Sequence, residues 1–203
     1  LYYNQAKSIG TLKLNTPEEY VQQYVNEYYL MDMFYRRALE AYHELVTLDI
    51  PIEAVINEAK RQLEQEYAKM ANVMNLEWLT CVKEKGEAFR GVTLGRQQNF
   101  YRTEGDGTVK QVVIVSDALR YEVAVELMQQ LAKEKHIATL TPYLAMLPTE
   151  TKYCKPALLP HHSLEMLGTE MLVDGTVLNT TDQRTAHLCK YKEGAVCMRY
   201  EEV

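Results

Sequence analysis

Apolar residues recur every three or four positions over residues 16–46, which keeps one face of a helix apolar along its length. Thr16, Pro17 and Glu19 stand at the head of this stretch in the pattern of a helix start, with Thr16 as the cap and Glu19 completing a capping box. The stretch therefore predicts one long amphipathic helix. Its apolar stripe consists of Tyr20, Tyr24, Tyr28, Met31, Tyr35, Leu39, Tyr42 and Val46.

A second stripe at helical spacing runs from Ile52 to Trp78. The segment Asp49-Ile50-Pro51 separates the two, because proline ends one helix and can begin the next. Two long helices joined by a short break predict an antiparallel helical hairpin. We interpret the stripes as packing faces rather than a cofactor site. Two helices cannot cover both stripes completely, so the hairpin is expected to lean on later residues or on another chain.

Further along the chain, β-type and helical patterns alternate. Residues 110–115 form a β-branched run, 118–135 have helical spacing, and 136–147 are extended. A strand, a helix and a second strand form a βαβ unit, which predicts a parallel sheet. The remaining predicted elements are helices over about 152–160 and 182–191, the second capped by Thr180 or Thr181, and a strand over 195–200.

The change of pattern predicts two domains. Gly86, Gly91 and Gly95 mark a loose stretch between them. We place a helical arm at 1–97 and an α/β core with a partial parallel sheet at 98–203. The first residue is Leu1 rather than Met, so we expect an excised segment of a longer protein.

Charge and cysteine usage exclude several classes of function. The net charge is −6, and the Lys and Arg residues are scattered among acids. The sequence therefore shows no basic cluster that could bind a nucleic-acid backbone or an anionic membrane. The longest aliphatic run, Val112–Val115, is far too short to cross a bilayer. The four cysteines lack metal or redox spacing, which indicates reduced thiols in a cytoplasmic protein.

Two positions could carry chemistry. Asp117 follows the β-branched run directly, and the carboxyl ends of parallel strands are where open sheets bind ligands. It is either a metal ligand or the cap of the following helix. Thr151, in the segment Pro148–Lys152, also follows an extended run and precedes a helix. It is either a plain helix cap or a hydroxyl nucleophile, which would need a metal to lower its pKa.

The strings SDALRYEVAVEL (116–127) and MLPTETKYCKPALLPH (146–161) resemble the core of the PglZ domain. This domain is a branch of the alkaline phosphatase superfamily found in bacterial phage-defence systems of the BREX type. A weaker similarity extends to V-D-G at 173–175 and T-x-x-R at 181–184. The Tyr-rich helices are loosely similar to the helical region that usually precedes the domain.

The resemblance implies an alkaline-phosphatase-like fold and a metal-dependent phosphoester hydrolase that holds two divalent ions such as zinc. Asp117 matches the first metal ligand of the superfamily. Thr151 matches the nucleophile, with Thr149 as the second candidate. The implied partners are a phosphoester substrate of unspecified kind and other defence-system proteins.

The further Asp and His ligands of the superfamily do not stand out in this sequence. None of the candidates forms an Asp-His or D-x-x-x-H arrangement; they are His161, His162, Asp174, Asp182 and His187. Truncation at Val203 would explain their absence, so we expect the chain itself to bind metal poorly and to be inactive. His161 and His162 are expected in an exposed turn and His187 in a helix, as a surface or packing residue.

Other side chains near the motif receive simpler interpretations. Arg120 and Glu122 could shape the crevice or pair on the surface, and we favour the surface pair. Lys152 could contact a phosphate. Two alternatives to the hydrolase remain. One is a non-catalytic scaffold of a defence complex that binds partners through its helical arm. The other, a receiver-like or flavodoxin-like domain, lacks the paired acids of a receiver and does not account for the P-T-x-T segment.

Overall fold

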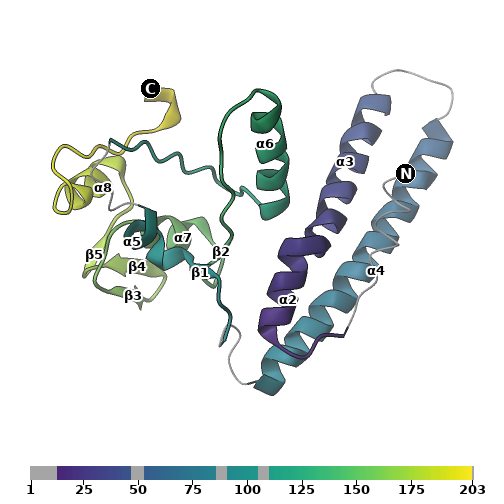
Figure 1. Ribbon diagram of the computed structural model, residues 1–203, viewed down its shortest axis with the longest axis horizontal. Helices are drawn as coiled ribbons and strands as arrows, with labels where there is room; N and C mark the ends of the chain where they lie inside the picture. The colour runs from purple at the N-terminus through teal and green to yellow at the C-terminus, as the bar shows by residue number, and fades with distance from the viewer. Residues whose placement is uncertain (1–12, 47–52, 86–90, 105–109, 203) are drawn as a thin grey trace. The chain divides into compact units, whose positions relative to one another are not determined.

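The computed structural model describes residues 13–46, 53–85, 91–104 and 110–202 (Figure 1). The predicted break at residues 49–51 and Gly86 lie outside these ranges. The chain divides into two compact units. Unit 1 contains Leu1–Thr93 and Leu119–Leu140, and unit 2 contains Leu94–Ala118 and Thr141–Val203.

Unit 1 is helical, as the first two stripes predict. The hydroxyl of Thr16 accepts a hydrogen bond from the N–H of Glu19 at 3.2 Å, which confirms the predicted cap. The carboxylate of Glu19 returns to the N–H of Asn15, one residue earlier than a capping box requires. The elements of unit 1 are α2 (Pro17–Gln23), the π-helical turn η1 (Tyr24–Tyr28), α3 (Tyr29–Val46), α4 (Glu53–Lys85) and α6 (Tyr121–Lys133).

The first long helical segment and α4 lie side by side and run antiparallel (Figure 1). Their contacts show the direction, because residue numbers rise along one partner and fall along the other. The core of the pair contains the fully buried Tyr28 and Met31, with Met70 and Met74 of α4 against them. The predicted hairpin is therefore confirmed for the described helices. Three cross-helix contacts are the rings of Tyr20 and Trp78 at 5.8 Å, the stacked rings of Tyr35 and Tyr67 at 3.8 Å, and Tyr42 Oη to Asn57 Oδ1 at 2.7 Å.

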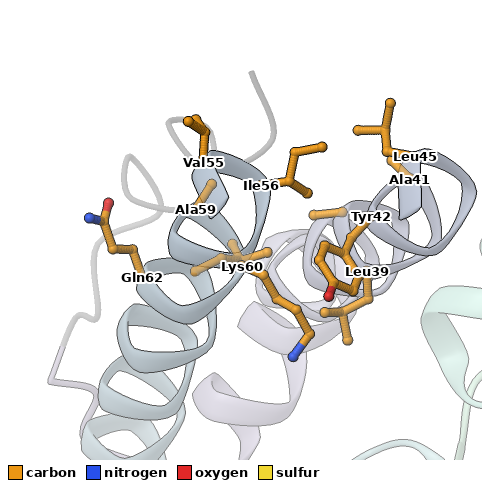
Figure 2. A pocket seen from close by; sticks show the side chains of 11 residues that line it. Leu39, Ala41, Tyr42, Leu45, Val55, Ile56, Ala59, Lys60 and Gln62 are labelled. Carbon is orange, nitrogen blue, oxygen red and sulfur yellow. The ribbon is translucent and has the colours of Figure 1, made fainter. Parts of the chain in front are cut away.

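The described residues leave the pair open at the end where the last turns of α3 meet the first turns of α4. A groove of about 450 Å³ lies there, with Leu39 and Tyr42 on one side and Val55 and Ile56 on the other (Figure 2). Val55 is 70% exposed. Within the described residues, the predicted packing faces are thus covered around Tyr28 and exposed at this end.

Helix α6 packs against α3 within unit 1, so the hairpin does lean on later residues. The contact is an ion-pair network that corrects one prediction. Glu122 is only 1% exposed and accepts three hydrogen bonds from Arg36 instead of pairing with Arg120 on the surface. Nε donates to both carboxylate oxygens at 3.1 Å, and Nη2 donates to Oε2 at 2.8 Å. Glu126 also binds Arg36, and Arg37 donates to it at 2.6 Å. Because α3 supplies two adjacent arginines, both carboxylates of α6 are neutralised where they become buried.

Unit 2 mixes short helices with two small sheets (Figure 1). Strand β1 (Gly95–Arg96) pairs in parallel with β2 (Tyr143–Leu144). Strands β3 (Leu164–Leu167), β4 (Glu170–Val173) and β5 (Thr176–Val177) form an antiparallel sheet in that order. The helices are η2 (Gln97–Asn99), α5 (Phe100–Glu104), α7 (Thr151–Ala157), α8 (Thr181–Leu188) and η3 (Tyr200–Glu202). The chain is thus a mixed helix-and-sheet protein whose parallel sheet is smaller than predicted.

The β-branched run at 110–115 is not a strand, which contradicts the prediction. Val112 and Ile114 are 82% and 84% exposed, and no strand among the described residues pairs with them. A parallel strand of this composition needs a partner along its edge and a cover on its faces. The described residues supply neither. Strand propensity without partners is too weak to fix an extended ladder.

The later helices agree better with the sequence. Helix α7 starts within one residue of the prediction, and α8 carries a complete capping box between Thr180 and Gln183. The extended stretch 136–147 keeps only β2 as a strand. The predicted strand 195–200 is absent: the segment has no ladder partner among the described residues and leads into η3.

Candidate functional site

Unit 2 brings Asp117 and Thr151 together. The Thr151 hydroxyl lies 3.2 Å from Oδ1 and 3.4 Å from Oδ2 of Asp117, and it donates to the carboxylate. The two residues are 34 positions apart in the sequence. Both face solvent, since Thr151 is exposed and the Asp117 side chain is 61% exposed. A carboxylate and a hydroxyl thus converge at an accessible point.

Neither residue acts as the helix cap that was the alternative for each. The N-cap of α6 is Arg120, three positions after Asp117. The N-cap of α7 is Glu150, so Thr151 is the first helical residue. Between Asp117 and α6 the chain turns at Ala118, whose φ of 56° lies in the left-handed region that costs an alanine about 1 kcal/mol or more.

Hydrogen bonds of Gln97 fix the start of α7. Its side-chain amide donates to the carbonyl of Cys154 at 3.1 Å and accepts from the N–H of Met146 at 3.0 Å. The same side chain therefore links α7 to the segment that leads into it. These two hydrogen bonds of Gln97 hold the exposed start of α7, and with it Thr151, in a defined position.

Lys155 is a member of the site that the sequence analysis did not single out. It lies one turn after Thr151 on the same face of α7, and its Nζ is 3.7 Å from Oδ2 of Asp117. The i, i+4 spacing from Thr151 was the available signal. Lys152, which the analysis did consider, is held by Glu150 at 3.3 Å and lies 4.7 Å from the ring centre of Tyr153.

The oxygens of Asp117 and Thr151 fit two positions around a divalent cation. Two oxygens bound to one ion at about 2.1 Å lie roughly 3 Å apart, which is close to the separation found here. No group of three or more His, Cys, Asp or Glu side chains within the described ranges could hold a metal ion. Catalytic zinc sites use three protein ligands, so these residues fit part of such a site and not the whole.

The other predicted candidates lie elsewhere. Thr149 is exposed, and its hydroxyl has no hydrogen-bond partner among the described residues. His187 is 3% exposed on α8, and its Nε2 lies 2.6 Å from the carbonyl oxygen of Pro160, which agrees with a packing role. His161 and His162 lie in a loop, where His162 is exposed as predicted, whereas His161 is half-buried rather than exposed.

Asp174 is a structural residue whose role the sequence analysis missed. Its Oδ1 accepts from the N–H groups of His162 and Ser163, both at 2.8 Å, and its Oδ2 accepts from the Tyr191 hydroxyl at 2.7 Å. Asp174 and Gly175 have φ of 49° and 76° and form the two-residue turn between β4 and β5. The Asp-Gly pair is the standard sequence signal for such a turn.

Replacing Asp174 by alanine is expected to lower the unfolding free energy by about 2–4 kcal/mol, because three bonds to a carboxylate are lost and the residue keeps a left-handed φ. Asp174→Asn is the matched control: it retains one acceptor oxygen, tolerates the same φ and should lose clearly less. Urea unfolding of the three proteins measures the difference, and an alanine variant as stable as the parent contradicts this role.

The effect of Asp174 should also depend on pH. Burial alone would raise its pKa, but the N–H of Ser163, the Tyr191 hydroxyl and the N–H of His162 outweigh it and lower the pKa to about 2 from 3.8. A depressed carboxylate pKa stabilises the fold above the unfolded value, and this contribution disappears as the pH falls from about 4 to about 2. The stability gap between the parent and Asp174→Asn should narrow over that interval.

The candidate site is thus an exposed carboxylate and hydroxyl in contact within unit 2. Residues 98–203 match the family described as the BREX system PglZ alkaline phosphatase-like domain. This match covers more than half of the chain, and the chain belongs to this family. The match confirms the predicted resemblance.

Two curated relatives carry related names. The chain is 25% identical over 195 residues to an alkaline phosphatase-like protein PglZ of Bacillus cereus (strain H3081.97), covering 92% of this chain and 22% of the relative. It is 38% identical over 111 residues to an alkaline phosphatase-like protein BrxZ of Escherichia coli O9:H4 (strain HS). This alignment covers 50% of this chain and 13% of the relative. The chain therefore spans less than a quarter of either relative. No solved structure gives a significant match.

Of the described helices, none combines the length and the apolar character that crossing a membrane requires.

Proposed function

We propose that this chain is part of a metal-dependent phosphoester hydrolase of a bacterial phage-defence system. Thr151 is the nucleophile and Asp117 is the first metal ligand. The observation that carries the proposal is the contact between the two side chains, at 3.2 Å and 3.4 Å, at an exposed point of unit 2. The alkaline phosphatase-like description of the family supports the same chemistry and an alkaline-phosphatase-like fold for the whole domain.

The chemistry follows from the hydroxyl and its neighbours. Thr151 Oγ1 attacks phosphorus in line and gives up its proton, the bond from phosphorus to the leaving oxygen breaks, and that oxygen takes up one proton and departs as the alcohol. Water then hydrolyses the phospho-threonine, which restores the hydroxyl and releases phosphate from a monoester or a phosphomonoester from a diester. Bound divalent ions such as zinc would supply charge neutralisation of the phosphoryl group and a lower pKa for the hydroxyl. Asp117 accepts the Thr151 hydrogen bond and so orients its oxygen.

The chain by itself is expected to be inactive, because the described residues provide only part of a metal site. Further ligands would come from the rest of the domain in the full-length protein. The substrate is a phosphoester, and the other proteins of the defence system are the natural partners, in the bacterial cytoplasm.

Hydrolysis by the full-length protein tests the proposal. A phosphomonoester and a phosphodiester with chromogenic leaving groups are assayed with added zinc and after chelation. We expect zinc-dependent turnover that falls at least a hundredfold in Asp117→Asn, since the amide keeps the shape but loses the ligand charge. Full activity in that variant would contradict the role of Asp117 as a metal ligand. Absence of turnover under every condition would contradict the hydrolase function itself.

A scaffold without catalysis is the second candidate. The observation in its favour is the apolar groove of about 450 Å³ at the open end of the α3–α4 pair (Figure 2). An apolar surface of the kind that the described residues leave exposed here is typical of contact with another protein. The same assay separates the two functions, because a scaffold gives no zinc-dependent hydrolysis.

A further inference from the structure

A second cavity lies in unit 2 and involves neither Asp117 nor Thr151. Its volume is about 310 Å³. It is lined by Tyr101 and Arg102 of α5, by Pro160, His161 and His162 of the loop before β3, and by Tyr191 after α8. We propose that this cavity is a binding site for a mononucleotide, with the base against the aromatic rings and the phosphate at Arg102.

The aromatic wall is centred on Tyr191. Its ring lies 6.3 Å from that of Tyr101 and 5.8 Å from that of His162, measured between centroids, and neither pair is stacked face to face. The hydroxyl of Tyr191 is held by Asp174 at 2.7 Å, which fixes one edge of the ring. Aromatic faces that are not stacked on each other are the surfaces on which nucleobases stack, with little preference among bases.

The loop that contributes Pro160, His161 and His162 to the cavity is held from two sides. The carbonyl of Pro160 lies 2.6 Å from Nε2 of the buried His187, and the N–H of His162 donates to Asp174 at 2.8 Å. His161 lies between these two anchors, and its Nδ1 is 2.7 Å from the carbonyl oxygen of Leu159. A carbonyl only accepts, so Nδ1 carries the proton. In the neutral ring Nε2 is then an acceptor, which suits the amino group of a base.

Arg102 provides the anion-binding group. Its side chain is exposed at the end of α5 and has no hydrogen bond or ion pair with any other described residue. A guanidinium binds phosphate through two parallel N–H bonds, which a lone ammonium cannot do. Asp174 is an opposite charge beside the cavity, because it contacts the lining residues His162 and Tyr191. It already accepts three hydrogen bonds, so its charge is directed into the fold.

The size and the chemistry of the cavity point to the same ligand class. About 310 Å³ is at the small end of ligand sites and accommodates one nucleotide rather than an oligonucleotide. The net charge of −6 argues against a long polyanion, whereas a single phosphate needs only one well-placed cation. This site is independent of the proposed hydrolase chemistry.

Calorimetric titration of the 203-residue chain tests the site with three probes: adenosine 5′-monophosphate, adenosine and inorganic phosphate. We expect the nucleotide to bind, with adenosine and phosphate each about tenfold weaker or more, because each probe lacks one half of the contacts. Arg102→Gln should weaken the nucleotide about tenfold and leave adenosine unchanged.

Arg199→Gln is the matched control, because it removes the same charge from an exposed residue of unit 2 that does not line the cavity. Tyr191→Leu should weaken both the nucleotide and adenosine, whereas Tyr191→Phe keeps the ring. Circular dichroism establishes that each variant remains folded. Three results overturn the proposal: no nucleotide binding, equal binding of phosphate and nucleotide, or equal losses in Arg102→Gln and Arg199→Gln.

Discussion

Substitution of Thr151 by alanine in the full-length protein is expected to reduce phosphoester hydrolysis by roughly three orders of magnitude or more, as expected when a nucleophile is removed. The methyl group of alanine cannot form the phosphoryl bond, and the hydrogen bond to Asp117 at 3.2 Å is lost with it. The measurement is turnover of a chromogenic phosphomonoester in the presence of zinc. Substrate binding should change much less than turnover, because the hydroxyl acts in the chemical step.

Thr149→Ala is the internal control for this prediction. Thr149 lies two positions earlier, is exposed, and has no side-chain hydrogen bond within the described residues. We expect its loss to leave turnover near the parent value. Thr151→Ser should keep part of the activity, since it retains a hydroxyl. If Thr149→Ala lost activity and Thr151→Ala kept it, the two threonines would exchange roles.

Substitution of Arg36 by methionine is expected to destabilise unit 1 by about 3–5 kcal/mol, the usual effect of leaving a buried charge without its partner. The Glu122 side chain is 1% exposed, and both of its carboxylate oxygens accept hydrogen bonds from the guanidinium of Arg36. The same hydrogen bonds raise the pKa of Arg36, with Glu122 as the largest cause. Chemical unfolding monitored by far-ultraviolet circular dichroism measures the change.

The double variant Arg36→Met with Glu122→Leu distinguishes a buried charge from lost packing. Removing both charges should recover much of the stability, because an apolar pair can replace a buried ion pair at small cost. Arg61→Met is the surface control: Arg61 pairs with Glu58 in solvent, and its loss should change little. A double variant as unstable as Arg36→Met would show that the energetic cost does not come from the carboxylate.

The long amphipathic helices were the most predictable part of the fold. The apolar spacing from Tyr20 to Tyr42 and the cap at Thr16 are both local sequence signals for a helix. These signals agreed with one another over many residues. The predicted domain boundaries at 1–97 and 98–203 stay predictions. Helix α6 illustrates the difficulty, because residues 121–133 follow the presumed boundary and yet pack against α3.

Elements that depend on partners were predicted less well. The run at 112–115 has every local property of a buried strand, but a strand exists only when another strand pairs with it. Glu122 was assigned to the surface because an acid on a helix usually lies there. Its burial depends on Arg36, 86 positions earlier, which no local pattern reveals. The Asp174-Gly175 turn, in contrast, carried a local signal that the analysis overlooked.

For the candidate site, the sequence motif identified two residues, and the structure showed how they and a third residue lie together. The strings around Asp117 and Thr151 marked both residues, and the structure places their oxygens in contact. Their catalytic roles stay predictions. Lys155 was not foreseen, because its proximity to Asp117 depends on the direction of α7. The cavity at Tyr191 was equally out of reach, since it forms from three segments that are distant in the sequence.

The uncovered run Val112–Val115 has a practical consequence for the behaviour of the isolated chain in solution. Its backbone N–H and C=O groups have no ladder partner among the described residues, and its β-branched side chains are exposed. Such a segment promotes aggregation, because in concentrated samples it can pair with the same segment of another molecule as β-strands. Colloidal stability of this chain is therefore expected to be limited by four residues rather than by its acidic surface.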